Sequence, residues 1–106
     1  MAWHKVFDSF EAAAEVIKDR TAILLLLNDH PVCIARYGNE LFATSDYCPH
    51  NKERLHNGVV NHLGEIICPW HQYRYKLTDG RECQARTADL ATYPVKSDEN
   101  GVYLKL

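Results

Sequence analysis

The sequence predicts a mainly β domain, a small sandwich or barrel that carries one helix. Three observations predict this fold class. The chain contains many short runs of apolar and β-branched residues, turn-forming pairs separate these runs, and only one stretch has helical periodicity. With 106 residues and a mass of 12.2 kDa, the chain has the size of one domain spanning residues 1–106.

The helix is expected between Asp8 and Arg20. Asp8 is a suitable N-cap residue, and Glu11 three residues later completes the pattern of a capping box. Apolar residues then recur at the spacing of one helix face, at Phe10, Ala13, Ala14 and Ile17. Lys18 and Arg20 are expected near the C-terminal end of the helix, where positive charge is favourable.

The strands are expected between recurring turn signals. These signals are Gly38-Asn39, Asn57-Gly58, Asp79-Gly80 and Asn100-Gly101. The expected strands are residues 22–27, 32–37, 40–44, 59–60, 65–67, 73–77, 91–96 and 102–106. The first of them is a continuous apolar run that we expect to be buried, and the next two have the pattern of a hairpin.

Composition and charge narrow the class of protein. The chain is 46% hydrophobic and 25% charged, which is typical of a globular protein, and its formal net charge of -2 does not favour nucleic acid as a partner. The longest apolar run, Ala22 to Leu27, is too short to span a bilayer, and the start of the chain lacks the pattern of a secretory signal. We therefore expect no membrane association and a cytoplasmic location, where thiols stay reduced.

Two short motifs contain the residue types that bind metals. They are Cys48-Pro49-His50 and Cys68-Pro69-Trp70-His71. Two cysteines and two histidines can bind either zinc or an iron–sulfur cluster. Zinc sites usually separate the cysteine pair from the histidine pair, whereas each motif here mixes both types. The mixed order suits a two-iron cluster, in which one iron takes both thiolates and the other takes both imidazoles; a structural zinc is the alternative.

The two motifs and the residues that follow them resemble the Rieske [2Fe-2S] iron–sulfur family. The following residues are Tyr73, Tyr75, Leu77, Thr78 and Gly80. The resemblance implies a Rieske-like fold of three small antiparallel sheets with an inserted cluster-binding subdomain at about residues 45–80, to which this chain adds the N-terminal helix. It also implies one [2Fe-2S] cluster, with Cys48 and Cys68 on the buried iron and His50 and His71 on the outer iron.

Two positions indicate the branch of that family, and two others depart from its usual pattern. Respiratory members carry a disulfide at the positions of Glu53 and Trp70, so the resemblance is to the soluble, ferredoxin-like branch. Members usually have glycine where this chain has Lys52 and Gln72, so we expect the loops to follow a slightly different path. Lys52 is a candidate for tuning the reduction potential through its charge; the alternative is a solvated lysine without that role.

Tyr73 and Tyr75 occupy positions that tune the reduction potential of high-potential relatives. Those relatives donate a serine hydroxyl to a bridging sulfide from the first position and a tyrosine hydroxyl to the first cysteine ligand from the second. We expect Tyr75 to hydrogen-bond Cys48 and Tyr73 to supply no bond. This predicts a potential in the lower or middle part of the Rieske range of about −150 to +300 mV. The alternative is that Tyr75 only packs as an aromatic ring.

The resemblance implies a one-electron carrier rather than an enzyme, which receives electrons from a reductase and passes them to a terminal oxygenase or a similar redox partner. One alternative is the Rieske small subunit of a multi-subunit enzyme such as assimilatory nitrite reductase, and another is a zinc-stabilised interaction module.

We expect Pro49, Leu55 and Trp70 to form a mildly apolar rim for docking. Cys33 is expected to be buried and Cys83 to be a free thiol.

Overall fold

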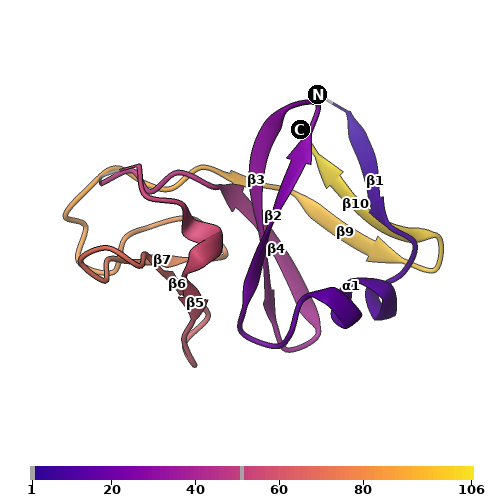
Figure 1. The fold of residues 1–106 in the computed structure, drawn as a ribbon, viewed down its shortest axis with the longest axis horizontal. Coiled ribbons are helices and arrows are strands. Elements are labelled where there is room, and N and C mark those ends of the chain that lie inside the picture. Colours follow the sequence, from indigo (N-terminus) through magenta and orange to yellow (C-terminus); the bar gives the residue numbers. More distant parts are fainter. Residues whose placement is uncertain (1, 51) are drawn as a thin grey trace.

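The computed structural model describes residues 2–50 and 52–106, whose strands form three small antiparallel sheets (Figure 1). The first sheet has the order β1–β10–β9, formed by Trp3–Phe7, Gly101–Lys105 and Val95–Asp98. The second has the order β2–β3–β4–β8, formed by Ala22–Leu27, His30–Tyr37, Glu40–Ser45 and Thr92–Tyr93. The third has the order β5–β6–β7, formed by Val59–Val60, Glu65–Ile67 and Arg74–Lys76. The predicted fold class of three small sheets with one helix is confirmed.

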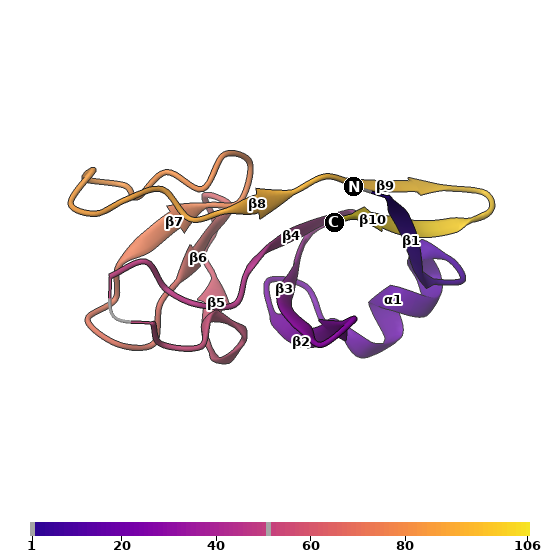
Figure 2. The ribbon, with the colours of Figure 1, turned by 90° about the horizontal axis from the view of Figure 1, so that it is seen from above.

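Two lobes lie along the longest axis of the molecule (Figures 1 and 2). The first two sheets and α1 (Phe10–Val16) form the base, residues 2–45 and 92–106. The third sheet, the short 3₁₀ helix η1 (Leu55–Asn57) and the surrounding loops form the site lobe, residues 46–50 and 52–91. The chain leaves the base after β4 and returns as β8, and these two strands are paired neighbours. The site lobe is therefore an insertion between adjacent strands of one sheet.

Strand β3 contributes to two hydrophobic cores, because successive residues of a strand point to opposite faces of the sheet. Cys33 and Ala35 pack into the core of the site lobe. Val32 and Ile34 pack into the core of the base, together with residues of α1. All four side chains are buried, so β3 joins the two lobes through packing on both of its faces.

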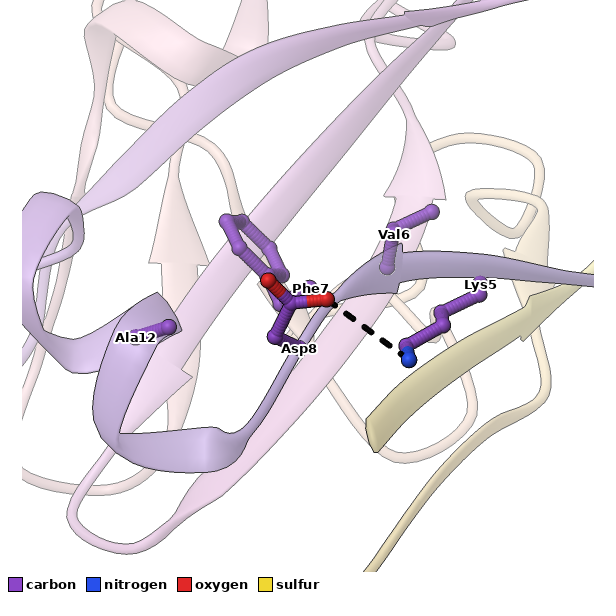
Figure 3. Close-up of a pocket in the computed structure, with 5 residues that line it drawn as sticks. All are labelled: Lys5, Val6, Phe7, Asp8 and Ala12. Carbon is purple, nitrogen blue, oxygen red and sulfur yellow. Dashed lines mark ion pairs between the residues drawn. The ribbon is translucent and has the colours of Figure 1, made fainter. Parts of the chain in front are cut away.

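The helix forms where the sequence predicts it, but its N-cap is Ser9 and not Asp8. Ser9 has an extended backbone, and its Oγ accepts a hydrogen bond from the Ala12 N–H at 3.0 Å. The Asp8 carboxylate is exposed and lies 3.6 Å from Lys5 Nζ instead. Figure 3 shows this ion pair at a pocket of the base, lined by residues 5–8 and Ala12. Among the residues that the structure describes, no helix has the length and apolar character needed to cross a bilayer.

Four further features differ from the sequence prediction. Strand β1 was not expected, and α1 ends at Val16, before Lys18 and Arg20. The apolar run of β2 is only partly buried because β2 is an edge strand, and the Leu26 side chain is 62% exposed. The strand expected over residues 91–96 is interrupted at Pro94, which has no N–H to donate to a sheet, and the chain continues as β8 and β9 in different sheets.

Candidate metal centre

The two cysteine–histidine motifs lie in two loops of the site lobe. The first loop follows β4 and is a tight turn, in which the Cys48 N–H donates to the Glu53 carbonyl at 2.9 Å and the Lys52 N–H donates to the Cys48 carbonyl at 2.7 Å. The second is the hairpin loop between β6 and β7, closed by a hydrogen bond of 2.8 Å from the Cys68 N–H to the Tyr73 carbonyl. Each loop therefore presents its cysteine at the point where the backbone leaves regular structure.

Both loops contain residues other than glycine in the left-handed backbone region. Lys52 has φ 62°, and the consecutive residues His71 and Gln72 have φ 63° and 61°. A side chain in this region costs about 1–2 kcal/mol, which glycine avoids. Lys52 and Gln72 stand where the resemblance leads to an expectation of glycine, and both adopt the conformation that glycine favours, so the loops carry the corresponding strain.

The two cysteines of the motifs are in contact inside the lobe. Cys48 and Cys68 are both fully buried, and their side chains are close enough to hydrogen-bond each other. Burial, with a further contribution from Cys48, raises the pKa of the Cys68 thiol to about 11. Without a cation the Cys68 thiol is therefore held neutral, and a metal centre would have to displace its proton.

The two histidines of the motifs lie together at the surface. The rings of His50 and His71 have their centroids 5.6 Å apart, with an angle of 67° between their planes, and both residues are exposed. Trp70 lies beside them, with its ring 5.4 Å from that of His71 and its surface 55% exposed. The site thus has a thiol pair on its inner side and an imidazole pair on its outer side.

These four side chains form two pairs and not one close group. Within residues 2–50 and 52–106, no three side chains of His, Cys, Asp or Glu gather as a group of the kind that holds a single ion. In each pair, one member comes from the first loop and the other from the second.

Tyr75, on the strand that follows the second loop, contacts the thiol pair. Its hydroxyl lies 3.2 Å from Cys48 Sγ, and its side chain is fully buried. Burial and the contact with Cys48 raise the pKa of the Tyr75 hydroxyl, so it remains protonated and can donate to sulfur. The predicted contact is therefore present, while its effect on a reduction potential stays a prediction.

The sequence interpretation missed the contact that Tyr73 makes with the outer side of the site. The Tyr73 ring is stacked on that of His50, with 4.0 Å between centroids and 9° between planes. The guanidinium of Arg86 lies 3.8 Å from the centroid of the same tyrosine ring. Arg86 forms an ion pair with Glu82, four residues earlier, and that spacing was the only sign in the sequence that the pair exists.

A buried carboxylate, also missed, holds the first loop against η1. Asp46 is fully buried, and its oxygens lie 2.7 Å from Arg54 Nε and 2.8 Å from His56 Nδ1. The His56 N–H donates a further bond of 2.8 Å to Asp46. Since Asp46 lies two residues before Cys48, this network fixes the start of the first loop.

The expected rim around the site is only partly present. Trp70 is exposed and Pro49 is partly buried, but Leu55 is fully buried in the core of the site lobe. The assignment of Leu55 to the rim was therefore wrong, because η1 directs this side chain inward. Cys33 is buried as predicted, and burial raises the pKa of its thiol to about 12. Cys83 is a partly exposed thiol.

Comparisons with known proteins agree with this arrangement. Residues 4–94 match the family described as "Rieske [2Fe-2S] domain". The ferredoxin component of naphthalene 1,2-dioxygenase/salicylate 5-hydroxylase systems from Ralstonia sp. is 30% identical over 96 residues, which cover 90% of this chain and 91% of the relative. The ferredoxin component of the 2,4-dinitrotoluene dioxygenase system from Burkholderia sp. (strain RASC) is 37% identical over 75 residues, covering 70% and 71%.

The fold also matches a solved structure. The ferredoxin of carbazole 1,9a-dioxygenase from Nocardioides aromaticivorans IC177 superposes with a TM-score of 0.81 over 98% of this chain and 97% of that chain, at 21% sequence identity. This likeness concerns the fold of the whole chain, including both lobes.

Proposed function

The chain belongs to the Rieske [2Fe-2S] family, and from this premise we propose that it is a ferredoxin-type one-electron carrier. It would receive electrons from a reductase and pass them to a terminal oxygenase or a similar redox partner. The observation that carries the proposal is the pairing of two buried thiols with two exposed imidazoles in one lobe. We propose that Cys48 and Cys68 hold the inner iron and His50 and His71 the outer iron of one [2Fe-2S] cluster.

The donor chemistry fits this group. Thiols bind iron as thiolates, and the positive charge of the metal lowers their pKa far enough to release their protons. Imidazoles bind as neutral ligands, which suits the exposed position of His50 and His71. A division into a thiol pair and an imidazole pair is the ligand set of a Rieske centre.

Each side of the site has its own part in electron transfer. A Rieske centre gains or loses one electron at a time. The buried thiols keep water away from the inner side, while the exposed rings of His50 and His71 give a partner protein a short route to the outer side. Trp70, exposed beside His71, adds apolar surface for a transient contact. These are the properties of a carrier and not of a catalytic enzyme.

Two residues are proposed to tune the reduction potential. Donation from the Tyr75 hydroxyl to the Cys48 sulfur withdraws negative charge and raises the potential, so Tyr75→Phe is expected to lower it. Lys52 is exposed, so its charge acts through water, and Lys52→Gln is expected to have a smaller effect. A Tyr75→Phe variant with an unchanged potential contradicts the role of the hydroxyl.

The comparisons support a separate carrier in preference to the small subunit of a nitrite reductase. The chain spans 91% of the length of the Ralstonia ferredoxin component, which belongs to dioxygenase and hydroxylase systems. A location in the cytoplasm is part of the proposal, and the presence of four cysteines as thiols supports it.

Anaerobic reconstitution followed by metal analysis tests the cluster. We expect about two irons and two sulfides per chain, visible absorption, and a rhombic electron-spin signal on reduction. Cys48→Ser and His71→Ala should each abolish the signal, while His62→Ala, an exposed histidine of the same lobe outside both motifs, should retain it. A colourless protein with one tightly bound zinc would contradict the proposal and support the interaction module.

Transfer to a partner tests the carrier role separately. The chemically reduced protein is mixed with an oxidised terminal oxygenase of a ferredoxin-dependent dioxygenase system, and loss of the reduced spectrum is followed in stopped flow. Transfer within seconds is expected. A loaded protein that remains reduced with every such oxygenase, yet copurifies with a large catalytic chain, would favour the enzyme-subunit alternative.

A further inference from the structure

The outer imidazole of the first motif is one end of a three-membered stack. The Tyr73 ring lies 4.0 Å from the His50 ring in a nearly parallel orientation, and the Arg86 guanidinium carbon lies 3.8 Å from the centre of the Tyr73 ring. Two planar groups this close to one ring cannot share a face, so His50 and Arg86 cover its opposite faces. Stacking and cation–π attraction both stabilise such an arrangement.

Glu82 fixes the position of the arginine at the end of the stack. Its two carboxylate oxygens lie 3.0 Å from Arg86 Nε and 2.6 Å from Arg86 Nη2, and the Arg86 backbone N–H donates a third bond of 2.8 Å. Glu82 is only 4% exposed. The carboxylate engages the edge of the guanidinium, which leaves its flat face available to the tyrosine ring.

The segment that carries this ion pair is attached to the same strand as Tyr75. Glu82 pairs with Tyr75 in an isolated antiparallel bridge, and the Cys83 N–H donates to the Arg74 carbonyl at 2.9 Å. Strand β7 therefore supports the contact of Tyr75 with Cys48 on the inner side and, through Glu82, the stack on His50 on the outer side.

We propose that Arg86 is a positioning residue for His50, acting through Tyr73, and that its positive charge offsets that of the Glu82 carboxylate and so keeps the reduction potential of the centre higher than the carboxylate alone would allow. The inference rests on the proposed function, because His50 must be a ligand of the outer iron for the stack to affect a potential. Reduction adds one negative charge to the centre, and a nearby cation stabilises that charge. The parallel stack also restricts rotation of the imidazole, so His50 enters the centre in one orientation.

Redox titration of the loaded protein tests the effect of the charge. Arg86→Gln is expected to reduce the equilibrium constant for one-electron reduction at least threefold, which is about 28 mV at 59 mV per factor of ten. Arg86→Lys retains the charge and is expected to stay nearer to the wild type. Arg81→Gln is the matched control, because it removes the same charge from an exposed arginine that makes no contact with Tyr73 or His50 among the described residues. Equal potentials for Arg86→Gln and Arg81→Gln would overturn the proposal.

The orientation of the imidazole is tested by the nitrogen hyperfine couplings of the reduced protein. Tyr73→Leu removes the ring but leaves the Glu82–Arg86 pair in place, so it is expected to change the coupling assigned to His50. Tyr73→Phe keeps the ring and is expected to preserve the coupling. If Arg86→Gln does not hold the centre, Tyr73→Leu still tests the positioning of His50, and a Tyr73→Leu protein whose His50 coupling matches that of the wild type overturns the proposal.

The two failures can be told apart. A wild-type chain that takes up no iron and sulfide overturns the proposed function and this inference with it. A loaded wild-type chain whose potential and couplings do not respond to the Arg86 and Tyr73 substitutions overturns this inference alone.

Discussion

The base and the site lobe of this protein are held together by different kinds of interaction. The base has most of the longer strands and a core of aliphatic and aromatic side chains. The strands of the site lobe have two or three residues each, and its core includes three cysteines and a tyrosine. Among the residues that the structure describes, the three buried carboxylates are Asp46, Glu65 and Glu82, and all lie in the site lobe. Regular pairing and apolar packing hold the base, whereas the site lobe depends on polar contacts that position particular side chains.

The backbone shows the same contrast. In the base, the left-handed residues other than glycine are Arg20, Asn28 and Asp29, and the short polar side chains of the last two tolerate this region. In the site lobe they are Lys52, His71, Gln72 and Ala85, none of which has such a side chain. Strain of this kind persists only where surrounding contacts fix the loop, and it is typical of functional sites.

The largest expected effects come from removing one buried leucine from each lobe. Leu104 in the base and Leu55 in the site lobe are both fully buried, so Leu104→Ala and Leu55→Ala should each reduce the free energy of unfolding by about 2–5 kcal/mol. Only Leu55→Ala is expected to accelerate loss of the iron–sulfur centre under native conditions, since it loosens the lobe that carries both motifs. Urea denaturation and the decay of visible absorption measure the two quantities. Equal rates of cluster loss in the two variants would show that a substitution in the base affects the centre as much as one in the site lobe.

The next largest effect concerns the buried carboxylate before the first motif. Asp46→Asn removes the charge that Arg54 and His56 share, and we expect a loss of about 1–3 kcal/mol in the free energy of unfolding. Hydrogen exchange of the His56 amide should also become faster. Asp8→Asn is the control in the base, because its exposed pairing with Lys5 is worth at most about 0.5 kcal/mol. Similar losses for the two variants would contradict the role given to Asp46.

The contrast between the lobes also explains which features could be predicted from the sequence. Strands β2, β3 and β4 were predicted because short apolar runs and a turn-forming residue pair can be recognised within a few neighbouring residues. The two motifs were recognised because metal ligands recur at fixed spacings. The roles of Tyr73 and Asp46 were missed because the folding of the loops brings their partners close to them, and no local residue pattern reveals such contacts. Leu55 was misplaced because a single leucine between two polar residues gives no sign of the side that it faces.

A smaller effect is expected on acidification. The Arg86 guanidinium and its hydrogen bonds hold the pKa of the Glu82 carboxyl well below its ordinary value of about 4.3. The folded state therefore binds this proton less tightly than the unfolded state, so the stabilisation is complete above about pH 5 and decreases as the pH falls towards the lowered value. The difference in free energy of unfolding between wild type and Glu82→Gln should shrink by about 1 kcal/mol between pH 6 and pH 3.

Denaturant titrations at each pH measure this difference. Glu40→Gln, which removes an exposed carboxylate from β4 of the base, serves as the control for the loss of one negative charge. A constant difference between wild type and Glu82→Gln across this range would mean that the ion pair contributes nothing to the stability of the site lobe.

The smallest expected effect compares one left-handed position in each lobe. Gln72 in the second loop has φ 61° and Gly38 in the hairpin of the base has φ 63°. Gln72→Gly should raise the free energy of unfolding by about 0.5–1 kcal/mol, because it relieves the strain of a side chain in this region. Gly38→Ala should lower it by a similar amount, since nothing lies within 4 Å of the added carbon and only the backbone opposes it. Gln72→Ala, which keeps a Cβ, is the control and should show no gain. If Gln72→Gly is no more stable than Gln72→Ala, the second loop is not strained at this position. Gln72 then does not contribute to the difference in backbone strain between the two lobes.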